Sequence, residues 1–262
     1  MRKEEMQEPA RRPRAAGLVM ALLLIATVGV ALGASLWTRD LVVKEVRVGG
    51  NRIVSSGEIY ALAAIPKNHR LYEVDLNSAR KRVLANQFFR SVSINRDVPD
   101  RISITVDERV PIAAIAGERM LYIDADRMVM PPARSEFIFD LPVLTGAIPQ
   151  SECVPGKRVT SELFIEALQI VSVAQKISDD FFRLISEVHI DAGGNIEIFT
   201  SESGVPVLFG RGDVAGKMVK LDAFWNEFVH ERGAQELQYI DLRFDDQVVV
   251  RWNEAKEFAS HR

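Results

Sequence analysis

Apolar residues are concentrated in one uninterrupted stretch near the N-terminus and recur periodically elsewhere. The stretch Ala15–Trp37 contains no charged residue. As a helix it would extend about 34 Å, enough to cross a hydrocarbon core of about 30 Å. It ends at Trp37, whose indole ring suits the headgroup region of a bilayer. The pattern therefore predicts one transmembrane helix at residues 15–37.

Charged residues beside this stretch predict its direction across the membrane. Three basic side chains lie close to its start, at Arg11, Arg12 and Arg14. Positively charged flanks stay in the cytoplasm. We therefore expect residues 1–14 to be a cytoplasmic tail and the bulk of the chain to be extracytoplasmic. The alternative is a cleaved signal peptide ending near Ala31-Leu32-Gly33, although the apolar run exceeds the usual length of about 7–15 residues.

Two glycines in the apolar stretch have the spacing of a helix-packing motif. Gly29 and Gly33 form a G-x-x-x-G pair, which allows a second membrane helix to approach closely. Glycine is also common in membrane helices for reasons unrelated to packing. The pair therefore predicts a membrane helix packing face, with a purely compositional origin as the alternative.

After the apolar stretch, short periodic segments predict one small domain. Alternating apolar and polar residues predict three strands, at residues 41–48, 92–96 and 102–106. Helical spacing follows Ser55, a predicted N-cap, and starts again near Asp75. Two helices on one face of a three-stranded sheet would make a single buried layer. We therefore expect a β-α-α-β-β domain over residues 41–110.

The pattern over residues 111–252 predicts a second domain that is rich in strands. Helical periods occur over Ser161–Ser178 and Asp213–Val229. Strand patterns occur at residues 120–124, 127–130, 185–190, 196–200, 205–209, 236–244 and 247–252. Asp245-Asp246 predicts the turn of a terminal hairpin. The fold class is therefore α+β, with a strand-rich domain containing two helices and a flexible tail at residues 253–262.

Charge and cysteine content exclude several kinds of function. The 262 residues carry a formal net charge of −3, and 26% of them are charged. A dedicated nucleic-acid binder usually carries a basic stripe, so we do not expect a nucleic-acid partner. The single cysteine, Cys153, excludes an intrachain disulfide, and no cysteine and histidine have zinc-ligand spacing. We expect no cofactor and no metal.

Two short motifs imitate catalytic or nucleotide-binding sites. Ser78-Ala79-Arg80-Lys81 has the S-x-x-K spacing, but the companion S-D-N and K-T-G motifs are absent. Residues 210–215 match G-x-G-x-x-A between a predicted strand and a predicted helix. The repeated strand–helix alternation of a dinucleotide-binding fold is missing, so Asp213 is better explained as a helix N-cap. We expect neither enzymatic activity nor a small-molecule substrate.

Several stretches resemble a family of bacterial membrane proteins. Three of them resemble a POTRA domain: Val46-x-Val48-x-Gly50-Asn51, Phe89-Arg90-Ser91-Val92 and Asp107-Glu108-Arg109-Val110-Pro111. A single POTRA domain directly after one N-terminal span is similar to the FtsQ/DivIB cell-division family. Two later stretches, Leu141–Gly146 and Tyr239–Phe244, also look like that family. The resemblance covers roughly residues 15–252.

The resemblance implies a role in assembly without a chemical reaction. It implies a single-pass scaffold of the divisome in the inner membrane, with a periplasmic POTRA domain and β domain, at the division septum. Such a scaffold would link early and late division proteins by binding FtsB-like and FtsL-like partners, and would contact other divisome membrane proteins and the lipid bilayer. The alternative is a POTRA-bearing transport or secretion component that handles extended polypeptides.

The terminal predicted strand is the candidate partner-binding site. It consists of Gln247, Val248, Val249, Val250, Arg251 and Trp252. An exposed sheet edge that lacks proline can accept a strand from another chain. Phe244 and Trp252 are candidate aromatic anchors, with a place in the core as the alternative for each. The resemblance also implies partner binding at this strand, with Phe244 replacing a more familiar tyrosine.

Overall fold

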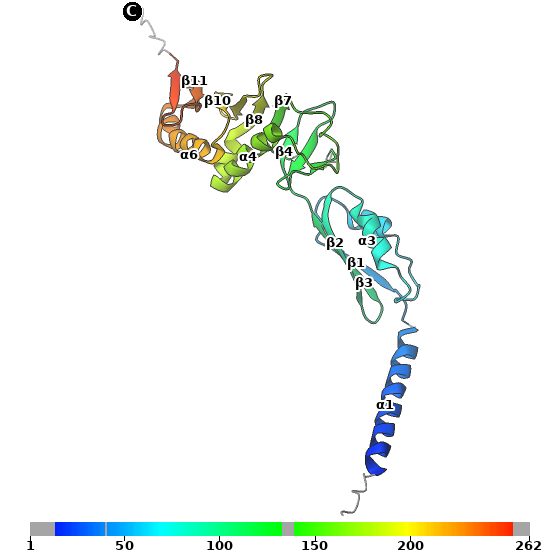
Figure 1. The fold of residues 1–262 in the computed structure, drawn as a ribbon. Helices are drawn as coiled ribbons and strands as arrows, with labels where there is room; N and C mark the ends of the chain where they lie inside the picture. Colours follow the sequence, from blue (N-terminus) through cyan, green and yellow to red (C-terminus); the bar gives the residue numbers. More distant parts are fainter. Residues whose placement is uncertain (1–13, 40, 133–138, 254–262) are drawn as a thin grey trace, which may run out of the picture. The chain divides into compact units, whose positions relative to one another are not determined.

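The structure, a computed structural model, describes residues 14–39, 41–132 and 139–253 (Figure 1). The chain divides into two compact units. One holds most of the residues before 107, and the other holds most of those after it together with 52–54 and 84–91. Of the predicted tails at residues 1–14 and 253–262, all but Arg14 and Asn253 lie outside the described residues; Arg14 begins a helix, and the Asn253 N–H donates to the Glu236 carbonyl.

The N-terminal apolar stretch forms a single helix, α1 (Arg14–Arg39). Its large apolar side chains between Leu18 and Leu32 are exposed. Over the described residues, no helix meets the length and hydropathy required of a membrane span. A Cβ atom placed on Gly29 or Gly33 would have no described heavy atom within 4 Å. The membrane span and the packing face therefore stay predictions from the sequence.

Within the described part of the chain, the first sheet has three strands in the order β1-β3-β2. Its elements follow the predicted sequence: β1 (Glu45–Gly49), α2 (Ser56–Ala63), α3 (Leu76–Leu84), β2 (Phe89–Asp97) and β3 (Arg101–Glu108). The strand β1 runs parallel to β3, with Val46 opposite Ile102. Ser55 caps α2 as predicted, because its hydroxyl accepts a hydrogen bond from the Glu58 N–H at 3.3 Å.

One boundary of this sheet differs from the prediction. Phe89 begins β2, three residues before the predicted start of this strand at residue 92. The helix stops at Leu84 because a turn follows, in which Asn86 accepts hydrogen bonds from the N–H groups of Phe88 and Phe89. This local side-chain and backbone pairing competes with continued helix.

The second sheet has nine strands over the described residues, in the order β12-β11-β10-β9-β8-β7-β4-β5-β6. Its strands are β4 (Pro111–Ile115), β5 (Leu121–Asp124), β6 (Val129–Met130), β7 (Val143–Gly146), β8 (Ile185–Ile190), β9 (Ile196–Thr200), β10 (Pro206–Gly210), β11 (Leu237–Asp241) and β12 (Val249–Trp252). The pairs β7–β8 and β10–β11 are parallel. Helical segments connect the two strands of each pair, because the chain has to return to the same end of the sheet before a parallel strand can begin.

Helices α4 (Glu162–Ile177) and α6 (Val214–Phe224) pack together and bury the core of this unit. Phe164 of α4 and Phe209 of β10 are fully buried in it. The predicted helix over Asp213–Val229 divides into α6 and a π-helix (Trp225–Val229). Three short elements of the described residues were not predicted: α5 (Asp179–Leu184), α7 (His230–Arg232) and a 3-10 turn (Ala234–Glu236). The expectation of two helices was therefore incomplete. Ser178 ends α4 and also caps α5, accepting the Phe181 N–H at 3.0 Å.

A buried ion pair links the residue Arg109, between β3 and β4, to the β5–β6 hairpin. The Arg109 Nη1 atom lies 2.6 Å from Asp124 Oδ2, and the two side chains are 13% and 5% exposed. The second oxygen of Asp124 accepts the Met128 N–H at 2.8 Å. Both charges are therefore compensated inside the fold, which is the condition for burying them.

Candidate functional site

The strand β12 forms one edge of the nine-stranded sheet. It pairs antiparallel with β11, placing Val250 opposite Ile240 and Val249 opposite Asp241. Within the described residues, no strand lies on its outer side. The outward backbone groups of β12 are therefore a template for another strand.

The direction of the backbone groups along β12 follows from one hydrogen bond. The Asn253 N–H donates to the Glu236 carbonyl at 2.7 Å, on the β11 side. Backbone groups alternate in direction along an antiparallel strand. Those of Val249 and Arg251 therefore also face β11, whereas those of Val250 and Trp252 face the open edge. An added strand would bond to these last two residues.

An aromatic groove lies beside the edge, on the side of the sheet that carries α6. Its volume is about 540 Å³, and its lining residues are Phe224, Phe228, Glu231, Arg232, Val250 and Trp252. The Phe224 ring stacks on Phe228, with centroids 5.5 Å apart, and lies 6.4 Å from Trp252. The Arg232 guanidinium lies 4.1 Å from the centroid of the Trp252 ring. Val250 and Trp252 thus present backbone to the open edge and side chains to the groove.

The π-helix explains why the groove is aromatic. Trp225 and Val229 within it are buried, whereas Phe228 is 50% exposed. A π-helix widens the helical turn and shifts the following side chains around the axis. The sequence predicted one continuous helix over Asp213–Val229 and not this change of helical form. The i, i+4 spacing of Phe224 and Phe228 is the sequence signal for their shared stripe.

The predicted binding strand is shorter than expected. Phe244, Gln247 and Val248 lie in the connection between β11 and β12 and not in a strand. The cause is Asp241, whose buried carboxylate accepts the Arg243 N–H at 3.0 Å and both guanidinium hydrogen bonds of that residue. This side-chain pairing turns the chain away from β12.

The hydrogen bonds from Arg243 also hold the pKa of Asp241 below its ordinary value, despite burial of the carboxyl. The Lys220 ammonium on α6 donates to the Asp245 carbonyl and ties the connection to the helix layer. Within this connection the Phe244 side chain is 47% exposed, so it lies outside the core. Its role as a partner anchor stays a prediction.

Of the predicted strand residues, β12 contains Val249, Val250, Arg251 and Trp252. Arg251 is exposed, and the other three are half-buried. Trp252 and Val250 pack against the edge of the core and also line the groove. Trp252 therefore belongs both to the core and to the candidate interface. Val248 also contacts the core from the preceding connection.

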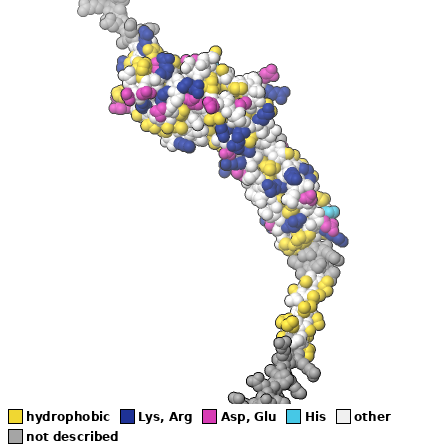
Figure 2. All heavy atoms as spheres, in the orientation of Figure 1, with side chains coloured by type: hydrophobic (Ala, Val, Ile, Leu, Met, Phe, Trp, Pro, Cys, Tyr) yellow, Lys and Arg dark blue, Asp and Glu magenta, His cyan; other side chains and the backbone are white. Residues whose placement is uncertain are grey.

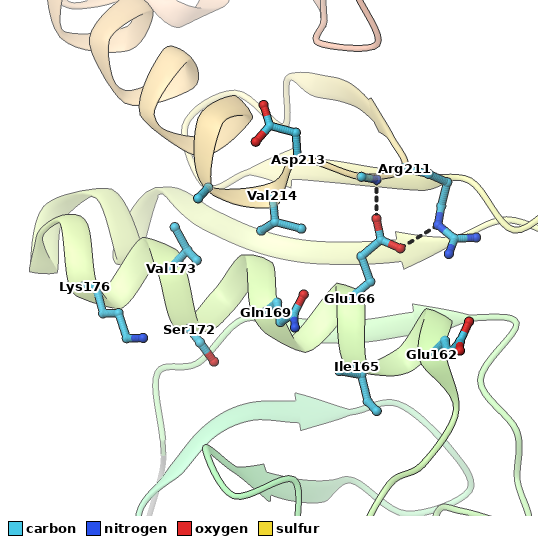
Figure 3. Close-up of a pocket in the computed structure, with 12 residues that line it drawn as sticks. Glu162, Ile165, Glu166, Gln169, Ser172, Val173, Lys176, Arg211, Asp213 and Val214 are labelled. Carbon is cyan, nitrogen blue, oxygen red and sulfur yellow. Dashed lines mark hydrogen bonds and ion pairs between the residues drawn. The ribbon is translucent and has the colours of Figure 1, made fainter. Parts of the chain in front are cut away.

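The G-x-G-x-x-A stretch forms the connection from β10 to α6, beside a groove of about 800 Å³ (Figure 3). The carboxylate of Glu166 accepts hydrogen bonds from the Gly212 N–H and the Arg211 Nε, both at 2.6 Å. Asp213 caps α6 as predicted, accepting the Gly216 N–H at 3.2 Å. These carboxylates occupy the positions where a nucleotide phosphate would need to bind.

Buried Lys217 completes this connection by donating to the carbonyls of Phe209 at 2.9 Å and Arg211 at 2.7 Å. Burial lowers the pKa of its ammonium group.

In the S-x-x-K stretch, the Ser78 hydroxyl donates to Asp75 at 2.6 Å, as part of a helix start. No group of three or more metal-ligating side chains converges in the part of the chain that the structure describes.

Two family models match successive parts of the chain. The model of the FtsQ-type POTRA domain matches residues 41–109, and that described as "FtsQ/DivIB, C-terminal related" matches residues 110–250. The chain belongs to the FtsQ/DivIB family. The resemblance noted from the sequence is therefore confirmed, and the FtsQ/DivIB match ends within β12.

Individual FtsQ/DivIB relatives match most of the chain. The protein of Rhodothermus marinus is 28% identical over 89% of this chain and 85% of its own length. Those of Geotalea daltonii and Syntrophotalea carbinolica are each 26% identical, over 79% and 88% of this chain and 74% and 81% of their own lengths. All three are named cell division protein FtsQ.

Proposed function

We propose that this FtsQ/DivIB member is a single-pass scaffold of the bacterial division machinery. The helix at residues 15–37 anchors it in the inner membrane, with the N-terminus in the cytoplasm and both folded units in the periplasm. It links early and late division proteins at the septum and acts without a chemical reaction. Its partners are small FtsB-like and FtsL-like division proteins.

The exposed edge of β12 is the single observation that carries this proposal. Val250 and Trp252 offer backbone donors and acceptors there, beside a groove lined by Phe224 and Phe228. Added strands gain affinity from main-chain hydrogen bonds and specificity from alternate side chains. A partner segment that pairs with Val250 and Trp252 would place every second side chain in the groove.

Anchoring strengthens this binding by confinement. The apolar side chains of α1 are exposed over Leu18–Leu32, as a helix surrounded by lipid requires. A scaffold and its partners that are held in one membrane meet at a raised effective concentration. A weak edge interaction can therefore hold an assembly together at the septum.

In-cell photo-crosslinking tests the proposal. A benzophenone amino acid replaces Phe228 or Phe244, which are exposed aromatic residues flanking the edge. The matched control is Val219 of α6, which is 58% exposed and does not line the groove. We expect capture of a small single-pass division protein from the two test positions but not from Val219.

Loss of this capture on Val250→Pro, in a chain that remains folded, would support strand addition. Equal capture from all three positions would contradict a specific site at β12. Capture of unfolded secreted chains would favour the transport component instead.

A further inference from the structure

The chain enters the first unit between two loops. The N–H of Leu71 donates to the Leu41 carbonyl at 2.8 Å, and the N–H of Asn68 donates to the Val43 carbonyl at 2.9 Å. On the other side, the Lys44 N–H donates to the Asp100 carbonyl at 2.8 Å. The loop at residues 67–72 and the turn at 97–100 are therefore fixed at the end of the unit where the chain arrives from α1.

These two loops carry exposed apolar side chains. Tyr72 is 49% exposed and Val98 is 48% exposed, and Pro99 beside it is also exposed. The Arg96 side chain connects the loops, because its Nε donates to the Leu71 carbonyl at 2.9 Å and its guanidinium lies 5.7 Å from the Tyr72 ring centroid. We call Tyr72, Val98 and Pro99 the apolar tip. Figure 2 shows hydrophobic side chains gathered at this end of the unit.

Charges around the apolar tip are largely compensated. Arg70 pairs with Glu73 at 3.0 Å, and Lys44 pairs with Asp100 at 3.4 Å. The apolar tip therefore lacks the strong positive field that would make anionic lipid its main target. Its binding capacity comes from its exposed apolar and aromatic surface.

Chain connectivity places the apolar tip near the predicted membrane surface. Leu41 follows Trp37, the predicted end of the span, by four residues, which extend at most about 14 Å. The loop bonded to Leu41 therefore stays close to the membrane at every orientation of the unit. Tyrosine favours the headgroup level, because one end of its ring is apolar and the other is polar.

We propose that the apolar tip docks onto the periplasmic surface of the membrane that anchors the chain. Tyr72 and Val98 enter the headgroup region, so that the first unit stands at a fixed orientation on the bilayer. This inference rests on the proposed membrane anchoring by residues 15–37. The contact is apolar, so it needs neither anionic lipid nor low salt.

Fluorescence of the full-length chain in phosphatidylcholine nanodiscs tests the docking. A Cys153→Ser background removes the native thiol, and Val98→Cys carries an environment-sensitive NBD label. The control label is at Ser93→Cys, an exposed position on β2 that lies five residues, or about 16 Å, before Val98 along the chain. We expect blue-shifted emission at 98, quenched by lipids spin-labelled near the headgroup, and water-like emission at 93. Tyr72→Ser should reduce the quenching at 98.

The outcomes separate this inference from the proposed function. Water-like emission at 98 in a chain that is stably inserted would overturn the docking and leave the anchor intact. A blue shift that required anionic lipid and disappeared at high salt would overturn the apolar contact. A chain that failed to insert into nanodiscs would remove the anchor on which both depend.

Discussion

Replacing Val250 by proline separates binding from folding at the candidate edge. The N–H of Val250 faces away from β11, so proline removes no hydrogen bond of the β11–β12 pair. Proline is tolerated on edge strands where the N–H faces solvent. Arg251→Pro is the matched control, because the N–H of Arg251 faces β11 and its loss breaks the pairing opposite Tyr239.

The hydrogen bonds that each proline removes determine the expected loss of binding and of unfolding free energy. Val250→Pro removes one intermolecular hydrogen bond and leaves a partner carbonyl unpaired, at a total cost of about 1–3 kcal/mol. We therefore expect binding to weaken by about 10–100-fold, since about 1.4 kcal/mol is tenfold. Unfolding free energy should fall by less than about 1 kcal/mol. For Arg251→Pro it should fall by about 1–3 kcal/mol, because a ladder bond is lost and its carbonyl acceptor is left unpaired.

Two measurements on the same preparations check this prediction. Denaturant unfolding gives the stability of each variant, and titration with the partner identified by crosslinking gives the dissociation constant. Normal affinity of a folded Val250→Pro chain would refute strand addition at β12. Equal destabilisation by the two prolines would refute the assignment of backbone direction.

Three further predictions concern the fold that supports the edge. Arg109→Ala should lower the unfolding free energy by about 3 kcal/mol in denaturant titration, because Asp124 is left as a buried, uncompensated charge. Phe164→Ala should cost about 3–5 kcal/mol by the same measurement, because its fully buried ring leaves a cavity. Hydrogen bonds from Arg243 lower the pKa of Asp241 in the folded state. The ionised Asp241 therefore stabilises the fold above its unfolded pKa of about 3.9, and this stabilisation is lost as pH falls through the folded pKa. Arg243→Gln should reduce this acid-dependent change, which thermal melts between pH 6 and pH 2 would measure.

Strand periodicity predicted much of the fold, because strands such as β3, β8 and β9 bury alternate residues. The strands at Ile185–Ile190 and Ile196–Thr200 have the predicted bounds, and α4 lies within one residue of its prediction at each end. The cap at Ser55 was also predicted, since its partner Glu58 is close in sequence. These features depend on local pattern alone.

The candidate site was predicted only in part, because its geometry depends on contacts that the pattern does not encode. The end of β11 is set by Asp241 folding back on Arg243, so Gln247 and Val248 fall outside the strand. The groove lies where α6 changes into the π-helix, and the apolar pattern did not predict that change. The apolar pattern therefore predicts the edge strand but not the aromatic surface beside it.

Amide hydrogen exchange along β12 tests strand addition most directly. Without partner, the amides of Val249 and Arg251 should be protected by β11, and those of Val250 and Trp252 should exchange faster. On partner binding, we predict new protection at Val250 and Trp252 with little change at the two others. Binding that left the exchange of Val250 and Trp252 unchanged would contradict the account.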